Sequence, residues 1–549
     1  MADNNHSRRL FLGCFIGLVA TAFGFAVRGA VLGDWEAQFE LSEEQKGIIG
    51  GVGLYPFAIS IILLSLVVDR IGYGTTMGLA FVGHLASALL TIFAPYVPFG
   101  TPFQVLYLAT FIYALSNGAV EAVINPVVAT LYKDNKTHWL NILHAGWPGG
   151  LVLGGLLSIA VLWGGEQIGD RLPGQLWQWQ MGVLLLPILG YGVLLAGQRF
   201  PQQERVEAGV SYRTMLEEFG WGSAYIVSFL IIMGVSQMLK VFGLPPIELW
   251  LALLIAMAPA AAFGLVIPSF GRPMFVFLML VMFLLATTEL GTDLWIQDIM
   301  KSVLSDPGAA AEGAGATLTP EMKGTLFLVY TSAIMFVLRF FAGPIVHRIS
   351  PLGLLALSAA IASGGLYWLG NAQPLFGPLL AAATLYGIGK TFFWPTTLGV
   401  VSEQYPRGGA LLLNAISGVG MIAIGTIGGP AIGTLQDLDF SAAVAQELPE
   451  VHAELTTKQT GLFFDYQAID ANKVAELPET VEQQVNAIQG QTKQQALAKI
   501  AVLPAIMCVC YLGLIAFFKS RGGYKAEVLA GHAADDEKFT GGVTGPVEA

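Results

Sequence analysis

Apolar stretches of about 20 residues recur along almost the whole chain, separated mostly by short polar segments. A stretch of that length crosses the hydrocarbon core of a bilayer as a single helix. The pattern therefore predicts an all-α polytopic membrane protein with about 14 transmembrane helices. The predicted spans are residues 10–32, 46–68, 76–95, 103–131, 138–163, 179–199, 222–242, 248–268, 272–300, 322–346, 352–371, 375–401, 409–435 and 498–518.

Composition supports this interpretation. Hydrophobic residues make up 54% of the chain and charged residues only 12%, with a mean hydropathy of +0.65, whereas soluble domains carry about a quarter charged residues. The opening residues MADNNHSRRL lead directly into the first apolar stretch without a small-residue cleavage site. We therefore expect a retained first helix and no signal peptide.

The distribution of Lys and Arg predicts the orientation, because cytoplasmic loops are enriched in both residues. The loops on one side of the predicted spans hold most of them, and the short loops opposite hold few. We therefore predict a multi-pass protein of the cell (inner) membrane with both termini in the cytoplasm. The residues on the basic side are Arg8, Arg9, Arg70, Lys133, Lys136, Arg199, Arg205, Arg213, Arg272, Arg348, Arg407, Lys519, Arg521 and Lys525.

The net charge of −11 comes mainly from one long hydrophilic loop and the acidic tail. Residues 436–497 hold ten Asp or Glu and three Lys, which gives −7. An acidic balance excludes a nucleic-acid-binding surface. We place this loop outside the cell and predict a helix at 476–500 with Pro478 in its first turn. We favour a solvated spacer for the rest, the alternative being a cap over the outer mouth or a docking site, and we expect disorder after Lys519.

An internal repeat divides the chain. The segment GAVEAVINP (118–126) corresponds to GIGKTFFWP (387–395), and each is followed by a polar turn and a Leu-Asn pair. Weak symmetry between halves is typical of secondary transporters. The repeat predicts two pseudo-symmetric six-helix bundles, with the extra pair 222–242 and 248–268 inserted between them and packed outside the core.

The predicted domain boundaries follow from this repeat. They are an N-terminal bundle at 1–200, a central cytoplasmic loop and inserted transmembrane hairpin at 201–270, a C-terminal bundle with the outer loop 436–497 at 271–518, and a cytoplasmic tail at 519–549.

Two cytoplasmic turns carry a resemblance to a known family. The turn DRIGYG (69–74) is similar to the Asp-Arg-x-Gly loop of the major facilitator superfamily, and RFFAGPIVHRISPLG (339–353) resembles its copy in the second half. The resemblance extends over nearly the whole chain. It implies the fold of that superfamily and transport by alternating access, and it is silent about the substrate.

A finer resemblance concerns the fucose and glucose/galactose:proton symporters. The segments VEAVINPVVATL (120–131) and LNILHAG (140–146) are similar to the Glu-x-x-x-Asn-Pro…Leu-Asn pattern of that branch. ELGTDLWI (289–296) and FFWPTTLGV (392–400) resemble its seventh and tenth helices. The resemblance implies proton-coupled sugar symport with Glu121 in the coupling. The chain departs from that branch on the first helix: the family uses a carboxylate there, whereas this chain has Arg28 in mid-span and no acid until Asp34 near the outer end.

Ionisable residues inside predicted spans cost about 2.5–3.5 kcal/mol each on insertion scales, so they usually face a cavity or a partner. Glu121 and Lys390 are the most informative, because each lies five residues before the proline of its repeat. We expect Glu121 to carry a proton, with Arg28 approaching it in one conformation. The alternative is a fixed Glu121–Arg28 ion pair. His144 either shares the proton or is a satisfied core histidine.

Helical spacing places the other polar candidates on shared faces. Residues four apart or three apart meet on one side of a helix, which pairs Glu121 with Asn125, Asn141 with His144, and Glu289 with Asp293. We expect these faces to line one cavity in which tryptophan rings stack on a sugar. The candidate substrate-binding residues are Asn125, Asn141, Trp147, Glu289, Asp293, Trp295, Lys390, Trp394 and Asn414.

Four charged residues are candidates for a cytoplasmic gate: Asp69, Arg70, Arg339 and Arg348. Arg339 lies nine residues before Arg348, roughly 13 Å along a helix from the cytoplasmic end. We therefore assign it to the gate and not to the substrate, and we expect Asp69 to pair across the halves.

Three functions remain open from the sequence. The first is proton-coupled symport of a hexose-like sugar. The second is transport of an organic or inorganic anion with Arg28 and Lys390 as counter-charges, and sodium-coupled sugar transport is a variant of the first. The third is a membrane assembly protein that does not transport.

An enzyme is not expected, because the chain has no Gly-rich phosphate loop, zinc spacing or nucleophile elbow. Its three cysteines form no disulfide framework. We expect no cofactor and no metal site, with energy from a proton gradient. The expected partners are a small-molecule substrate and the lipid bilayer, with no nucleic acid, and the protein is expected to be monomeric.

Overall fold

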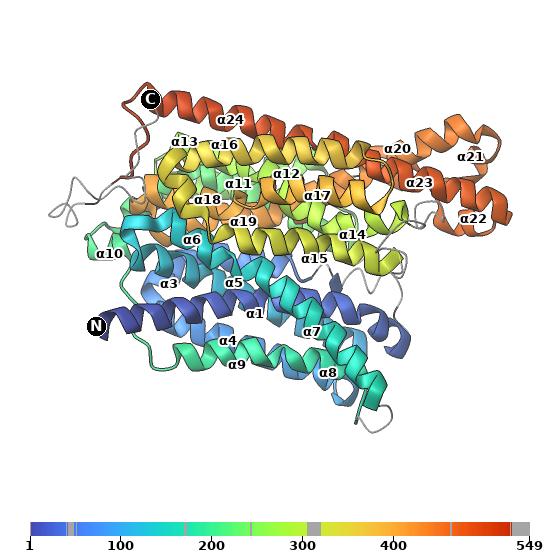
Figure 1. Ribbon diagram of the computed structural model, residues 1–549. Coiled ribbons are helices and arrows are strands. Elements are labelled where there is room, and N and C mark those ends of the chain that lie inside the picture. The colour runs from blue at the N-terminus through green and yellow to red at the C-terminus, as the bar shows by residue number, and fades with distance from the viewer. Residues whose placement is uncertain are drawn as a thin grey trace.

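The computed structural model describes residues 2–39, 41, 49–50, 52–168, 173–241, 244–304, 320–461, 464–527 and 529. It is almost entirely helical (Figure 1), with two groups of long helices that run in nearly the same direction and lie against each other. Helix α1 begins and helix α24 ends at the same end of the molecule, which we call the terminal side. The terminal side is the one predicted to be cytoplasmic.

The N-terminal bundle comes from the first 195 residues. Its elements are α1 (Ala2–Phe39), α3 (Tyr55–Ile71), α4 (Tyr73–Ile92), η1 (Ala94–Tyr96), α5 (Pro102–Leu131), η2 (Lys133–Asn135), α6 (Lys136–His144), α7 (Gly146–Ile168), α8 (Leu176–Val183) and α9 (Leu185–Leu195). A short helix, α10 (Glu204–Glu207), follows on the terminal side.

The C-terminal bundle begins at Pro273. Its elements are α13 (Pro273–Ala286), η4 (Thr287–Gly291), α14 (Thr292–Val303), α15 (Pro320–Arg339), α16 (Ala342–Asn371), α17 (Phe376–Lys390), α18 (Phe393–Gln404), η6 (Pro406–Gly408), α19 (Gly409–Ala423), η7 (Ile424–Gly428), α20 (Gly429–Glu447), α23 (Glu479–Ile500) and α24 (Val502–Lys519). Helix α16 contains a kink at Ser350, so it joins two predicted spans.

Eleven helical segments of the described chain are long and apolar enough to span a membrane. The chain is therefore a multi-pass α-helical membrane protein, as the apolar pattern predicts. Some predicted spans are divided or shortened, so the count of 14 stays a prediction. The span 375–401, for example, is divided into α17 and α18 around Thr391 and Phe392, and α3 covers the second part of 46–68.

The inserted hairpin consists of α11 (Tyr212–Val241) and α12 (Leu249–Val266). Helix α11 packs on α19 at the edge of the C-terminal bundle, and α12 packs on the outer side of α11. Most of α12 is exposed in the isolated chain, which suits a surface in contact with lipid acyl chains. The hairpin thus lies outside the two bundles, where the repeat predicts it.

The outer loop is a folded unit, which corrects the expectation of a mainly solvated spacer. It contains α21 (Pro449–Leu455), an antiparallel hairpin of β1 (Thr456–Thr460) and β2 (Asp465–Ile469), α22 (Ala471–Ala475) and the predicted helix, observed as α23. Phe440, Val444, Leu455, Val485 and Ile488 form its small apolar core. The unit projects beyond the bundles on the side opposite the termini (Figure 1). The residues of this core are widely separated in the sequence, so no continuous apolar run predicted it.

The two bundles meet on the terminal side. Helix α6 packs on α18, and α3 packs on α19. In this interface the hydroxyl of Thr137 donates to Glu403 (2.5 Å), and Lys136 donates to the carbonyl of Ser402 (3.4 Å). Gly399 permits the approach, because a β-carbon there would lie 2.3 Å from the Thr137 hydroxyl. The structure is therefore closed on the terminal side.

Candidate functional site

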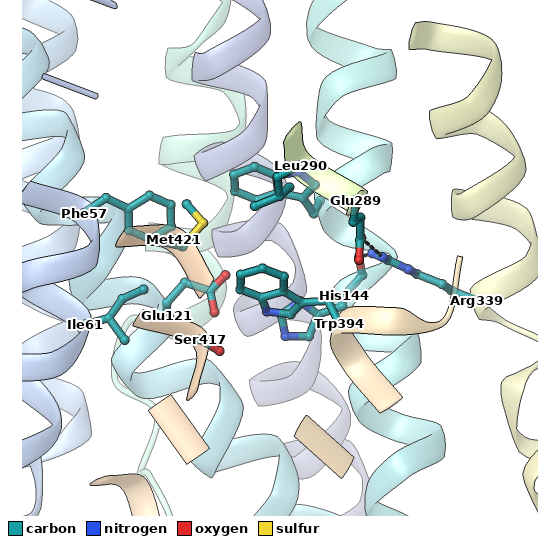
Figure 2. Close-up of a pocket in the computed structure, with 11 residues that line it drawn as sticks. Phe57, Ile61, Glu121, His144, Glu289, Leu290, Arg339, Trp394, Ser417 and Met421 are labelled. Carbon is teal, nitrogen blue, oxygen red and sulfur yellow. Dashed lines mark hydrogen bonds and ion pairs between the residues drawn. The ribbon is translucent and has the colours of Figure 1, made fainter. Parts of the chain in front are cut away.

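A cavity lies between the bundles, with about 410 Å³ of empty space when the part open to solvent is included. Both halves contribute to it (Figure 2). The lining residues are Phe57, Ile61, Glu121, His144, Trp147, Glu289, Leu290, Arg339, Trp394, Ser417 and Met421. Five of the residues predicted for proton coupling or substrate binding are among them: Glu121, His144, Trp147, Glu289 and Trp394.

A hydrogen-bonded chain begins at Glu121. Asn125 Nδ2 donates to Glu121 Oε2 (2.8 Å), and His144 Nε2 donates to Asn125 Oδ1 (2.8 Å). The carboxylate accepts only, so it fixes the orientation of the amide, and the amide oxygen in turn requires a proton on Nε2. The predicted face shared by Glu121 and Asn125 is therefore present, and it extends to His144 of α6.

Arg339 lies in the cavity, which corrects its assignment to the cytoplasmic gate. Its guanidinium donates to Glu289 Oε1 (3.0 Å), to the His144 carbonyl (2.5 Å) and to the Thr391 carbonyl (2.8 Å). The side chain is 1% exposed. Counting residues along one continuous helix placed Arg339 too close to the gate. In the structure α15 ends at Arg339, and the chain turns before α16 begins. Arg339 and Glu289 form the ion pair drawn in Figure 2.

A π-helical turn separates Glu289 from Asp293. Residues Thr287–Gly291 form this turn, η4, between α13 and α14. A π-turn bonds i to i+5 and so shifts the phase of the residues on either side. Glu289 faces the cavity, whereas Asp293 pairs with Lys390 of α17. Neither Asp293 nor Lys390 contributes to the cavity lining in the described chain, contrary to the expected common face.

Two tryptophans and two open polar atoms characterise the cavity. The Trp147 ring stacks on Phe57 (6.4 Å between centroids), and Trp394 packs against Gly420, where a β-carbon would lie 2.8 Å from the indole. Glu289 Oε2 and Ser417 Oγ are buried and have no hydrogen-bond partner among the described residues. Buried polar atoms are normally paired, so each of these two can still take a hydrogen-bond partner. In the view of Figure 2, Trp394 lies between Glu121 and the Glu289–Arg339 pair.

Arg28 does not contact Glu121 in this structure. Its guanidinium donates to Ser87 (2.8 Å) and lies 4.0 Å from the centroid of Tyr113. Its Nε and Nη1 have no partner among the described residues. Tyr113 and Glu121 are eight residues apart on α5, about 12 Å along a helix. The fixed Glu121–Arg28 ion pair is therefore not formed, and an approach in another conformation stays a prediction.

The remaining substrate candidates lie around the cavity without lining it. Asn141 donates to Thr396 (3.2 Å) and Asn414 to the carbonyl of Ala122 (2.9 Å), and both bonds join the two halves. Trp295 packs near Gly433 of α20. Asn141 and Asn414 thus hold the two bundles together beside the cavity.

The predicted gate residues are on the terminal side, apart from Arg339. Asp69 pairs with Arg205 of α10 (2.5 Å), in the segment between the halves and not in the opposite half. Arg70 lies 4.3 Å from the centroid of Tyr212, and Arg348 is exposed. A buried pair that the sequence analysis did not identify, Lys136–Glu204 (2.7 Å), lies beside them.

Sequence reasoning missed several lining residues. Ser417, Met421, Phe57 and Ile61 belong to α19 and α3, and these helices carry no intramembrane charge at the cavity. Their signal was weak, since apolar and small side chains at helical spacing fit packing equally well.

Comparison with known proteins identifies the fold. No family model matches the chain, and no curated protein sequence matches it. Solved structures do. The major facilitator superfamily proton:xylose symporter XylE, bound to 6-bromo-6-deoxy-D-glucose, is similar with a TM-score of 0.57 and 13% identity, over 92% of this chain and 95% of that one.

Two further similar structures have other substrates or states. FucP in the outward conformation, a major facilitator superfamily transporter, has a TM-score of 0.51 and 14% identity over 91% of this chain and 98% of that one. A bacterial homologue of the human drug peptide transporters PepT1 and PepT2 has a TM-score of 0.55 and 12% identity over 94% and 99%. At these identities the likeness establishes the fold alone: the chain has the fold of major facilitator superfamily transporters.

Proposed function

We propose that the protein is a major facilitator superfamily transporter that carries a hexose-like sugar together with a proton. The observation that supports this most is the charge of the cavity. Its lining contains two carboxylates, Glu121 and Glu289, and one permanent cation, Arg339. Arg339 pairs with Glu289, so Glu121 is the acid left without a cation among the described residues.

Proton coupling follows from the cost of that unpaired charge. Glu121 is 5% exposed, and an ionised carboxylate with so little contact with water costs several kcal/mol, a cost that a bound proton removes. The closed intermediate of the transport cycle therefore favours the protonated protein. When the cavity opens to water on either side, Glu121 can ionise and exchange its proton. His144, linked through Asn125, already holds a proton on Nε2, so Nδ1 is the neighbouring site that can take that proton.

The polar atoms of the cavity fit a hydroxylated, uncharged solute. Glu289 Oε2 can accept from a sugar hydroxyl, and Ser417 can donate to one or accept from one. The rings of Trp147 and Trp394 offer apolar faces for the C–H side of a sugar ring. Two of the similar structures are sugar symporters by name, for xylose and, in the E. coli fucose:proton symporter, for fucose.

The anion alternative receives less support from the same geometry. Lys390 is paired with Asp293 outside the lining, and Arg28 contacts Ser87 and Tyr113. Arg339 is the cation that faces the cavity, and an anion would have to displace Glu289 from it. Sodium coupling would use the same unpaired carboxylate, Glu121. Transport assays in which sodium is replaced by another cation are therefore needed to distinguish sodium coupling from proton coupling.

Uptake of radiolabelled sugars and organic acids into proteoliposomes tests the proposal. We expect one hexose or pentose to accumulate under an imposed inward proton gradient, with sodium absent. We expect Glu121→Gln to abolish accumulation while counterflow exchange of the same sugar continues, because the amide retains the bond to Asn125 but cannot release a proton.

Asp34→Asn is a matched control. Asp34 is an exposed carboxylate near the end of α1 that lies away from the terminal side. Accumulation that survives Glu121→Gln would refute coupling through Glu121. Accumulation that requires sodium would identify sodium, and not the proton, as the coupling ion. Uptake limited to organic acids would identify an anion, and not a sugar, as the substrate.

A further inference from the structure

The start of the C-terminal tail is attached to the terminal side of the C-terminal bundle, which corrects the expectation of disorder directly after Lys519. Tyr524 is 2% exposed, and its hydroxyl donates to Glu403 Oε2 (2.8 Å). Two main-chain groups of the tail also bond: Glu527 N donates to the Glu403 carbonyl, and Gln404 Nε2 donates to the Lys525 carbonyl, both at 2.8 Å. Leu529 is buried.

Glu403 is the residue on which these contacts converge. It is fully buried at the end of α18. One carboxylate oxygen accepts from Tyr524 of the tail, and the other accepts from Thr137 of the N-terminal bundle (2.5 Å). A single side chain therefore connects the tail with the contact that closes the terminal side.

The chemistry of Tyr524 suits a permanent donor. Burial, followed by the neighbouring charge of Glu403, raises the pKa of Tyr524 well above its ordinary range. The phenol therefore stays protonated and donates. Its ring packs edge-on against Phe518 at 5.1 Å, which fixes the hydroxyl on the carboxylate. The hydroxyl holds Glu403 in the orientation that Thr137 needs, and the tail shields the carboxylate from water.

We propose that residues 524–527 act as a clasp that stabilises the state closed on the terminal side, through Glu403. The described hydrogen bonds of the clasp are all to the C-terminal bundle, so it does not tie the halves directly. It acts by excluding water and by orienting Glu403 toward Thr137. Release of the tail would let water compete for the carboxylate, weaken the Thr137–Glu403 bond and favour opening. The inference goes beyond the proposed function. It depends on that function in one respect, namely that the two halves move apart on the terminal side during transport.

The distance between the halves can be measured without any substrate. Spin labels at Asp134→Cys and Arg348→Cys, both exposed on the terminal side in opposite halves, report opening by double electron–electron resonance in nanodiscs. The native cysteines Cys14, Cys508 and Cys510 are replaced by alanine in every protein. Because the readout needs no transport, failure of the clasp and failure of the sugar or proton assignment are separate results.

Removal of residues 522–549 should raise the ratio of open to closed protein about tenfold, and Tyr524→Phe by a smaller factor, as expected for weakening a hydrogen bond to a buried carboxyl group. Tyr466→Phe is the matched control. Tyr466 also donates to a carboxylate, Asp437 (2.7 Å), but in the outer unit, and we expect it to leave the ratio unchanged.

A double-mutant cycle separates this role from general stabilisation. Thr137→Val should open the terminal side by itself, and Tyr524→Phe should then add nothing, since both act through Glu403. An unchanged distance distribution in the folded, truncated protein would overturn the proposal. So would a Tyr524→Phe effect that is the same with and without the Thr137 hydroxyl.

Discussion

The two copies of the internal repeat carry residues of opposite charge at the same position. Glu121 and Lys390 each precede the repeat proline by five residues. In the first copy, α5 continues through Pro126, and Glu121 reaches the cavity without a cation among its described partners. In the second copy the helix is interrupted between Lys390 and Phe393, and Lys390 is paired with Asp293. Equal positions in a repeat therefore do not imply equal roles.

The partner decides the role in each half. A buried pair that is broken on one side leaves a charge in a low-dielectric environment, so Lys390 and Asp293 are constrained to stay together. Glu121 has a neutral amide as partner, and a proton can come and go without leaving another charge behind. The comparison predicts that mutations of the two residues affect different properties: stability in the second copy, coupling in the first.

The largest effect is expected for Lys390→Met. The substitution leaves the largely buried carboxylate of Asp293 (side chain 16% exposed) without its cation and should lower apparent stability by about 3–5 kcal/mol. Thermal unfolding in detergent measures this. The double variant Lys390→Met/Asp293→Asn should recover most of the loss. Lys458→Met breaks an exposed pair with Asp465 (2.7 Å) and should cost less than about 1 kcal/mol. A loss that Asp293→Asn does not relieve would show that the pair is not what holds Lys390.

How far the sequence could predict this comparison depends on the distance between partners. Apolar length and the repeat were sufficient for the bundles, the inserted hairpin and the position of Glu121 in the site. Glu121–Asn125 was predictable because helical spacing alone brings the two together. Lys390–Asp293 and Arg339–Glu289 join residues that are 97 and 50 positions apart, and their pairing depends on how separate helices pack.

Two local irregularities explain most of the remaining differences. The π-turn Thr287–Gly291 removes the common face of Glu289 and Asp293, and nothing in the apolar pattern reveals an i to i+5 turn. The end of α15 at Arg339 places that side chain in the cavity. Both are features of packed helices, decided by neighbours such as Gly428, where a β-carbon would lie 2.4 Å from Thr287 Oγ1.

An intermediate effect is expected for Glu289→Gln, which compares the two acids of the cavity. It leaves Arg339 without its counter-charge, but the amide oxygen of Gln still accepts from the guanidinium, so the cost should be about 1–3 kcal/mol of stability. With Arg339 uncompensated, we expect sugar binding to weaken about tenfold and organic anions to bind. Isothermal titration with both ligand classes measures this. If the anions stay unbound and sugar affinity is unchanged, Glu289 does not contribute to the substrate site.

The smallest effect on stability is expected for Glu121→Gln, the variant with the largest expected effect on coupling. Its side-chain oxygen can still accept from Asn125, and no described cation loses a partner, so apparent stability should change by less than about 0.5 kcal/mol. Thermal unfolding at neutral pH, beside Lys390→Met, measures the contrast. A loss of several kcal/mol would mean that ionised Glu121 neutralises a cation in a populated state, with Arg28 as the candidate, since its guanidinium has two unpartnered nitrogens in the described structure. Glu121 would then resemble Lys390 after all, and the two copies of the repeat would differ in sign but not in role.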